Sequence, residues 1–308
     1  MRLYRRVRLQ STDYQFSMNK PNISLRETHY QQALSWRDNG GQPDLQGSDL
    51  SGQDLTLVDL AGANLTEANL HQTRLAGANL AGARLERADL SESLLEDANL
   101  DTASLIHANL QRANLHEASL IRADLAGARL SQADLTEAML LGANLSGVDL
   151  RLTHLRQASL KGANLTGANF AGALLIESLL AGANLQQAKN LNGAYLKQAN
   201  LSRANLTGLN MAGAFLGQAS LMEADLSQIN LAGAFLGQAD LTRATLKQAN
   251  LAGAFLGGAI LRQADLSGAS LRGAVLTGAN LLQANLSQAD LAGADLRGAI
   301  MPDGQEYK

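Results

Sequence analysis

The chain has 308 residues, a net charge of −3 at pH 7 and no cysteine. The lack of cysteine excludes a disulfide framework and a thiolate metal site and fits a reducing compartment, and no apolar run approaches the length that spans a membrane. The first residues include arginines but not the apolar stretch of a secretory signal, so we expect a cytoplasmic protein.

Residues 1–43 lack the repeat that fills the rest of the chain, and we predict that they form an arm and a short capping helix. The helix is expected at about residues 25–38, with Ser24 as its N-cap and Glu27 completing a capping box. The run Asn39-Gly40-Gly41 would end the helix. Its apolar face would consist of Tyr30, Ala33 and Leu34.

The same segment is basic and aromatic, with seven Lys or Arg against three Asp or Glu and five of the eleven aromatic residues. Because a solenoid needs a cover over its open first coil, we interpret the segment as a plug. The alternative is a basic arm that contacts an acidic partner, for which four arginines are a thin signal. These are Arg2, Arg5, Arg6 and Arg8.

From residue 45 onward, leucine or another apolar residue returns at every fifth position. The series runs from Leu45 to Leu185, restarts one residue out of phase at Leu191 and ends at Met301, which gives 52 centres. A small residue, nearly always Ala, lies two residues before each centre, and the residue between them is most often Asn or Asp. Internal repeats of this kind determine the architecture.

A period of five fits neither a helix nor a straight strand. On a helix, successive leucines would be spread around the cylinder, and on a strand they would alternate between the two faces. All leucines can face one interior only if the chain turns a corner within each repeat. We therefore predict that Leu and the preceding Ala point inward, whereas the residue between them and the two residues after Leu point outward.

A second period indicates how many corners close one coil. Three similar segments recur at 20-residue intervals, which correspond to four pentads: MAGAFLGQ from Met211, LAGAFLGQ from Leu231 and LAGAFLGG from Leu251. Four corners make a square coil, and the 52 centres predict 13 coils. If the coils pair through backbone hydrogen bonds at roughly 4.8 Å per rung, the rod is on the order of 60 Å long.

This pattern resembles that of the pentapeptide-repeat family, A(D/N)LXX, over about residues 44–301. The resemblance implies an all-β fold, a right-handed quadrilateral β-helix, and the handedness comes from the resemblance alone. All three prolines, Pro21, Pro43 and Pro302, lie outside the span of the centres, as expected because an interior proline would remove a ladder donor. We expect three segments: residues 1–43, the solenoid 44–301 with a phase shift at 186–191, and the tail 302–308.

One outward column of the predicted rod is apolar. In the phase of the 20-residue echo, the residue before the leucine is aromatic or aliphatic in six successive coils, although this position is elsewhere mostly Asn, Asp or Ser. The stripe would be about 25 Å long and cover a few hundred Å², the size at which an exposed apolar patch indicates an interaction site. The six residues are Leu174, Tyr195, Phe215, Phe235, Phe255 and Val275, and Ile176, Leu179 and Ile260 lie on or near the adjoining corner.

We interpret these six residues as a contact surface for a protein partner or for another copy of the chain. The alternative is that the rings only stack on one another, or that the N-terminal arm folds over them. A neighbouring column of polar residues has the character of a structural ladder, because stacked amides can bond the rungs above and below. It comprises Asn190, Asn210, Asn230, Asn250, Ser270 and Asp290.

Two further features concern the shape of the rod. The phase shift inserts one residue into one corner, which predicts a local bulge or, alternatively, a small protrusion for a partner. The tail after Met301 is too short for a capping helix, so we expect Pro302 or another subunit to protect the last edge.

Catalytic and metal-binding patterns are missing from the sequence. The five histidines form no HxxxH or HExxH spacing, and neither GxxxxGK[ST] nor a GxGxxG in a strand-to-helix setting occurs. His116 and His154 would lie about 10 Å apart, too far to share one metal ion. Because Leu and Ala fill the predicted interior, we expect no enzyme, no catalytic residues, no metal, no cofactor and no small-molecule substrate.

Function is therefore expected on the outside of the rod. The preferred hypothesis is a non-catalytic binding or scaffold protein, since the resemblance includes members that regulate differentiation through protein contacts. The alternative is mimicry of DNA, because other members resemble a duplex and bind a type II topoisomerase, gyrase. Duplex DNA would carry about 35 charges over ~60 Å, whereas residues after 43 carry a net charge of −7. We expect neither nucleic acid nor membrane as a partner.

Overall fold

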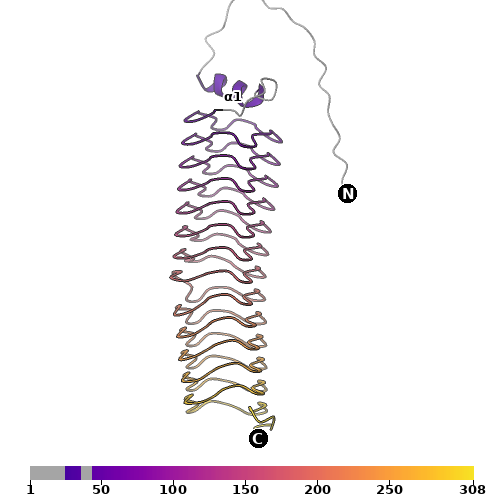
Figure 1. Ribbon diagram of the computed structural model, residues 1–308, viewed down its shortest axis with the longest axis vertical. Coiled ribbons are helices and arrows are strands. Elements are labelled where there is room, and N and C mark those ends of the chain that lie inside the picture. Colours follow the sequence, from indigo (N-terminus) through magenta and orange to yellow (C-terminus); the bar gives the residue numbers. More distant parts are fainter. Residues whose placement is uncertain (1–24, 36–43) are drawn as a thin grey trace, which may run out of the picture.

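The computed structural model describes residues 25–35 and 44–308, which form a long rod of stacked coils (Figure 1). The helix α1 (Leu25–Ser35) lies across one end of the rod, and the C-terminus lies at the other. No helix in the described residues is long and apolar enough to cross a membrane.

The coils stack through parallel pairing of residues 20 positions apart, such as Asp49 with Asn69. Each pairing is a single-residue bridge, and the described part of the repeat contains no longer strand. Two backbone hydrogen bonds flank the bridge: Leu50 N–H donates to the Asn69 carbonyl at 2.8 Å, and Asn69 N–H donates to the Ser48 carbonyl at 2.8 Å. Each coil between the first and the last is thus bonded to the coils before and after it.

The bridged residues form four columns, which we use to define the four sides of the rod. The first to fourth sides begin, in that order, at Asp44, Asp49, Asp54 and Asp59. In the last coil the same sides carry Asn285, Asp290, Asp295 and Ile300. Because a coil turns through all four sides, the first and third sides lie opposite each other, as do the second and fourth.

The interior contains the leucines and the small residues that precede them, as the repeat predicts. Leu145 is 1% exposed and the neighbouring Ala143 is fully buried, and the same holds for nearly all centres. Each fully buried leucine stabilises the fold by roughly 1.5–3 kcal/mol. A thin rod can therefore fold because its apolar interior runs continuously from one end to the other.

The corners combine a left-handed backbone with a side-chain hydrogen bond. The second residue after each leucine has a positive φ, which glycine adopts readily at Gly147 (φ 65°) and which Glu117 also adopts (φ 56°). The outward Asp or Asn accepts the backbone N–H two residues later, as Asp89 does from Ser91 at 3.0 Å. The frequent Asn and Asp of the repeat therefore serve the turns.

The inserted residue changes the pairing offset from 20 to 21 residues, so that Leu174 pairs with Tyr195. Asn190 adopts a positive φ of 60° at this point. On the second side, neither Lys189 nor Asn190 forms a bridge to Asn210, so the ladder of the described residues is interrupted there. The insertion lies one coil after Phe170, the largest fully buried side chain of the described residues.

Helix α1 covers the first coil through its side chains. Ala33 is fully buried and Tyr30 packs against the core, but Leu34 is 45% exposed, so its predicted place on the apolar face was wrong. Longer polar side chains of the helix form hydrogen bonds with the backbone of the first coil instead. Ser24 and Asn39-Gly40-Gly41 lie outside the described residues.

Three hydrogen bonds attach α1 to backbone groups of the first coil on three different sides. Gln32 Nε2 donates to the Asp44 carbonyl at 2.9 Å, and Tyr30 OH donates to the Asp54 carbonyl at 3.2 Å. His29 Nδ1 accepts the N–H of Asp49 at 3.1 Å. These bonds satisfy groups that have no preceding coil to pair with.

The C-terminal tail turns back onto the last coil. Glu306 pairs antiparallel with Ile300, and Tyr307 N–H donates to the Ala299 carbonyl at 2.7 Å. The turn passes through Gly304, whose φ is 87°. The tail itself therefore protects the fourth side, a solution that was not among the sequence-based expectations.

Candidate interaction surface

The six residues predicted for contact lie in one continuous column on the third side of the rod. Each pairs with the next through a backbone bridge, from Leu174 through Tyr195, Phe215, Phe235 and Phe255 to Val275. The parallel ladder therefore holds these six side chains one above another. Leu179 and Ile260 lie on the adjoining fourth side, and Ile176 lies at the corner between these two sides.

Three rings of the column stack face to face. The ring centroids of Tyr195 and Phe215 are 5.0 Å apart with planes inclined by 6°, and those of Phe215 and Phe235 are 5.1 Å apart with planes inclined by 1°. This spacing follows from the separation of hydrogen-bonded coils, roughly 4.8 Å. The stacking covers the ring faces and leaves the ring edges toward solvent.

Phe255 departs from the stack and lies over the neighbouring corner. A Cβ placed at Gly257 would be 2.7 Å from Cζ of this ring, and one at Gly237 would be 2.8 Å from its Cε1. Because real side chains do not approach that closely, the ring occupies the space that these two glycines leave open. The lower face of Phe235 thus has no stacked ring beneath it.

Small residues border the aromatic rings on both corners. On one corner the first turn residue is Gly217, Gly237 or Gly257, and on the other it is Ala212, Ala232 or Ala252. The aromatic rings therefore project from a band of small residues, with no long side chain at these bordering positions. The role of these small residues was not predicted, although the recurring AGAFLG motif contains the signal.

The rings remain accessible in spite of their stacking. Tyr195 and Phe235 are each 49% exposed, Phe255 is 43% exposed and Phe215 is 37% exposed. Other exposed apolar residues, such as Leu57 and Leu152, lie at corners elsewhere along the rod. Scattered apolar residues are normal on a protein surface, whereas a continuous column is not.

The polar ladder on the second side is bonded internally over part of its length. Asn230 Nδ2 donates to Asn210 Oδ1 at 2.9 Å, and Asn250 Nδ2 donates to Asn230 Oδ1 at 3.1 Å. Asn190 donates instead to Asn169 at 2.8 Å, because the insertion displaces it from the column. The side-chain amides of this ladder therefore help to hold successive coils together.

Charges on the surface are mixed and often paired. Arg297 donates two hydrogen bonds to the carboxylate of Asp295, at 2.9 and 2.6 Å. These bonds, with the backbone N–H of Arg297, lower the pKa of Asp295 from 3.8 to about 2. Arg203 similarly pairs with Glu223 at 2.9 Å. The described surface therefore has ion pairs along its length where a DNA mimic would need unpaired acids.

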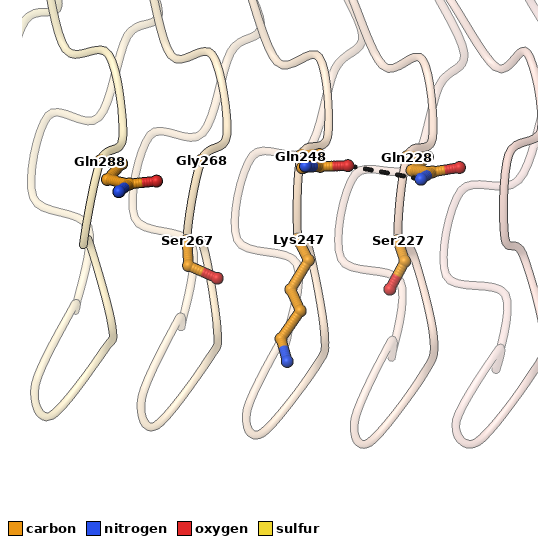
Figure 2. A pocket seen from close by; sticks show the side chains of 7 residues that line it. All are labelled: Ser227, Gln228, Lys247, Gln248, Ser267, Gly268 and Gln288. Atoms are coloured by element: carbon orange, nitrogen blue, oxygen red, sulfur yellow. Dashed lines mark hydrogen bonds between the residues drawn. The ribbon is translucent and has the colours of Figure 1, made fainter.

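Surface hollows of the rod are shallow grooves along its corners. One groove, of about 390 Å³, follows successive turns between the first and second sides. Figure 2 shows its side chains projecting from parallel turns, with Gln228 donating to Gln248 at 3.3 Å. Lys247 in this groove pairs with Asp265 at 3.4 Å. Within residues 25–35 and 44–308, no cluster of His, Cys, Asp or Glu has the arrangement of a metal site.

The chain belongs to the pentapeptide-repeat family, whose members fold as right-handed quadrilateral β-helices and generally act as non-enzymatic structural or binding proteins. The family model "Pentapeptide repeats (8 copies)" matches seven segments that together span nearly all of the repeat. Two adjacent matches meet between residues 189 and 190, at the insertion. The matched residues are 44–82, 78–120, 118–157, 158–189, 190–221, 224–263 and 264–301.

Solved structures of the same family are similar to this chain. HetL of the cyanobacterium Nostoc sp. strain PCC 7120, a protein involved in heterocyst differentiation regulation, is 33% identical over 89% of this chain and 97% of its own, with a TM-score of 0.31. A pentapeptide-repeat protein of the Arabidopsis thaliana thylakoid lumen is 34% identical over 33% of this chain and 77% of its own, with a TM-score of 0.31. QnrB1, a plasmid-mediated fluoroquinolone resistance protein, is 18% identical over 70% of this chain and 89% of its own, with a TM-score of 0.30. No curated protein matches the sequence.

Proposed function

We propose that this protein is a non-catalytic binding rod of the cytoplasm, built of about 13 coils capped by α1, and that it acts by protein contact through its outer surface. The column Leu174, Tyr195, Phe215, Phe235, Phe255 and Val275 is the proposed contact surface. The observation that supports this most is the exposure of stacked rings, since Tyr195 and Phe235 are each 49% exposed. The occupant is another protein or a second copy of this chain.

The aromatic rings of the column are not needed to close the coil. Interior packing already closes the coil without them, because Leu216 and Leu236 behind the column are fully buried. Rigid aromatic side chains lose little conformational entropy when a partner covers them, and such residues dominate the binding energy of many interfaces. Phe235, at mid-column and 49% exposed, is the proposed anchor.

A regulatory role is the form of this proposal that the relative HetL favours, since that protein is involved in the regulation of heterocyst differentiation. Gyrase binding by mimicry of DNA is less favoured, because the residues after 43 have a net charge of only −7 and their arginines are interspersed with the acids. We therefore expect the purified protein to leave DNA supercoiling by gyrase unchanged at sub-micromolar concentration. Inhibition in that assay would promote the mimicry hypothesis.

The contact surface is tested with the double variant Phe215→Ser and Phe235→Ser, compared with Asn210→Ser and Asn230→Ser on the second side of the same coils. Self-association is measured by light scattering, and partners are captured from source cells and identified. We expect the aromatic variant to lose its partner while its melting temperature stays close to that of wild type. The control should keep the partner.

Unchanged assembly and unchanged partners in the aromatic variant would contradict the proposal. A large loss of stability would also contradict it, because the rings would then be covered within the free protein. Residues 1–24, which include Tyr4, Tyr14 and Phe16, would be the first candidates for such a cover.

A further inference from the structure

The corner between the fourth and the first side carries cations without ionic partners, and we call this corner the basic edge. Four Lys or Arg residues at its turn positions are exposed. None of the four forms an ion pair with a described residue. Their charges are therefore available to an anionic partner. They are Arg122, Lys161, Arg243 and Arg262.

Charge is distributed differently on the other corners. On the opposite corner, between the second and third sides, Arg112 pairs with Glu92 at 3.4 Å and Arg151 pairs with Asp149 at 2.8 Å. The corner between the third and fourth sides carries acids in three successive coils. The rod therefore presents its unpaired positive charge mainly along one edge, although residues after 43 have a net charge of −7. The three acids are Asp97, Glu117 and Glu137.

Apolar side chains lie between the cations of the basic edge. Arg122 N–H donates to the Leu141 carbonyl at 2.9 Å, and Gly142 N–H donates to the Lys161 carbonyl at 2.9 Å. The turn that carries Leu141, which is 46% exposed, therefore lies between the turns of Arg122 and Lys161. The stem of Arg122 extends toward this turn, because a Cβ placed at Gly142 would be 3.8 Å from its Cγ.

The same mixture of cations and apolar residues recurs farther along the basic edge. Arg203 N–H donates to the Met222 carbonyl at 2.9 Å, and Arg243 N–H donates to the Arg262 carbonyl at 2.9 Å. Ile260 lies two residues before Arg262, on the fourth side. Each cation is thus close to an exposed apolar side chain of its own or a neighbouring coil. The exposed apolar residues of this stretch are Met139, Leu141, Met222 and Ile260.

The shape of the basic edge favours a flat partner. The turns of successive coils form rows along the rod (Figure 1), and the row from Arg122 to Arg262 is about 34 Å long at roughly 4.8 Å per coil. Side chains that project from such a row are too far apart for one small molecule to contact them all. A flat surface with negative charge outside and apolar material beneath it can contact all of them at once.

We propose that the basic edge is a membrane-contact surface, on which the rod lies against a bilayer that contains anionic lipids. The unpaired cations bind the anionic headgroups, and Leu141 and Met222 enter the boundary between headgroups and acyl chains. Long cationic side chains suit this place because their stems pack on apolar material while their charges stay in water. No membrane partner was expected from the sequence, since the residues of this edge are spread over separate coils and form no continuous apolar run.

This orientation turns the aromatic column away from the bilayer. The basic edge adjoins the fourth and first sides, so the second and third sides face away from a membrane on which the edge rests. Asp97, Glu117 and Glu137 are repelled by an anionic surface and therefore keep the fourth side from lying flat on it. Tyr195 and Phe235 stay accessible to a protein partner, so the membrane contact is independent of the proposed protein contact.

The test measures co-sedimentation of the full-length protein with vesicles of phosphatidylcholine and phosphatidylglycerol, and with vesicles of phosphatidylcholine alone. We expect binding only to the anionic vesicles and weaker binding at high salt, which screens the charges. Arg243→Gln with Arg262→Gln should weaken binding roughly 25-fold, about fivefold for each cation. Glutamine fits the turn at residue 243, because Gln263 has a positive φ of 58° at the same position one coil later.

Two further variants serve as controls for this measurement. Arg112→Gln with Arg151→Gln makes the same change in net charge at equivalent turn positions on the opposite corner, and it should keep vesicle binding close to that of wild type. Phe215→Ser with Phe235→Ser should also keep vesicle binding, because the aromatic column faces away. Failure of the protein contact and failure of the membrane contact are thus measured separately.

A fluorescent probe tests the orientation of the rod. Because the chain has no cysteine, Leu141→Cys or Leu152→Cys places a single polarity-sensitive fluorophore on the basic edge or on the opposite corner. Anionic vesicles should shift the emission to the blue for the probe at residue 141 and leave the probe at residue 152 unchanged. Equal shifts at both positions would overturn the proposal.

The binding measurements can also overturn it. Absence of vesicle binding by the wild-type protein would do so, and so would equal losses in the two arginine variants. Undiminished binding by Arg243→Gln with Arg262→Gln would show that another basic region, such as the arginines of residues 1–24, carries the binding. Binding to soluble polyglutamate but not to vesicles would show that the basic edge recognises an acidic chain instead.

Discussion

Leu236 and Phe235 are neighbours in sequence, yet they belong to two columns with opposite physical roles. Leu236 is fully buried in the interior, and its backbone N–H donates to the Phe255 carbonyl at 2.7 Å. Phe235 is 49% exposed and its ring stacks on that of Phe215. Both columns recur every 20 residues, but only the interior recurrence is required for the coil to close. The recurrence of aromatic residues on the outside is therefore not required for folding and can serve another purpose.

The largest expected effect comes from placing a charge in the interior column. Leu145→Asp should prevent folding, because an unpaired carboxylate in an apolar channel has no compensating partner. Leu145→Ala should reduce the free energy of unfolding by about 2–5 kcal/mol through lost burial and the cavity that remains. Circular dichroism and chemical denaturation measure both variants. A wild-type spectrum and melting temperature for Leu145→Asp would be incompatible with the filled interior.

The outer column should respond much less. Phe235→Ser removes one stacked ring, and an aromatic pair contributes about 0.5–1.5 kcal/mol beyond its burial. We expect the free energy of unfolding to fall by no more than about this amount, as measured by urea denaturation. A loss as large as that of Leu145→Ala would show that the ring is buried in solution.

Gly257→Ala tests how the Phe255 ring packs at the edge of the aromatic column. The added Cβ would meet the Phe255 ring, which must then leave the corner. Since Gly257 does not have a positive φ, the backbone accepts alanine, and stability should change by less than about 1 kcal/mol. Near-ultraviolet circular dichroism should change as Phe255 moves toward Phe235. An unaltered aromatic spectrum would mean that the ring does not rest on the glycines.

The smallest expected effect is on the stability of the protein at low pH. Hydrogen bonds from Arg297 lower the pKa of Asp295 to about 2 from 3.8. A lowered carboxyl pKa contributes stability that is fully present above the unfolded value and is lost as the pH falls through the folded value. We expect a small decrease between about pH 4 and pH 2, measured by urea unfolding. Asp295→Asn should reduce this decrease, and an identical pH profile in both proteins would contradict the pairing.

Much of the interior could be predicted from the sequence, because a five-residue period leaves one way to bury every leucine. Leu145 and Ala143 are buried where the period places them. The position of Tyr195 beside Leu174 also followed from counting across the insertion. Local periodicity thus determines which residues share a column.

Side-chain orientation and the two ends could not be predicted in this way. Phe215 and Phe255 occupy equivalent repeat positions, yet one ring stacks and the other covers Gly257. Leu34 was expected on the apolar face of α1, but contacts with the coil decide that face, and the helix binds through Ala33 and Tyr30 together with polar side chains. The returning tail depends on pairing between Glu306 and Ile300, which no repeat encodes.

The most direct test compares Leu236→Ala with Phe235→Ala by urea unfolding of both proteins under identical conditions. If the interior builds the rod and the outer column is reserved for contact, Leu236→Ala should lose about 2–5 kcal/mol and Phe235→Ala no more than about 1.5 kcal/mol. Equal losses in the two variants would show that the aromatic column is part of the folded core, and the proposed contact surface would then be wrong.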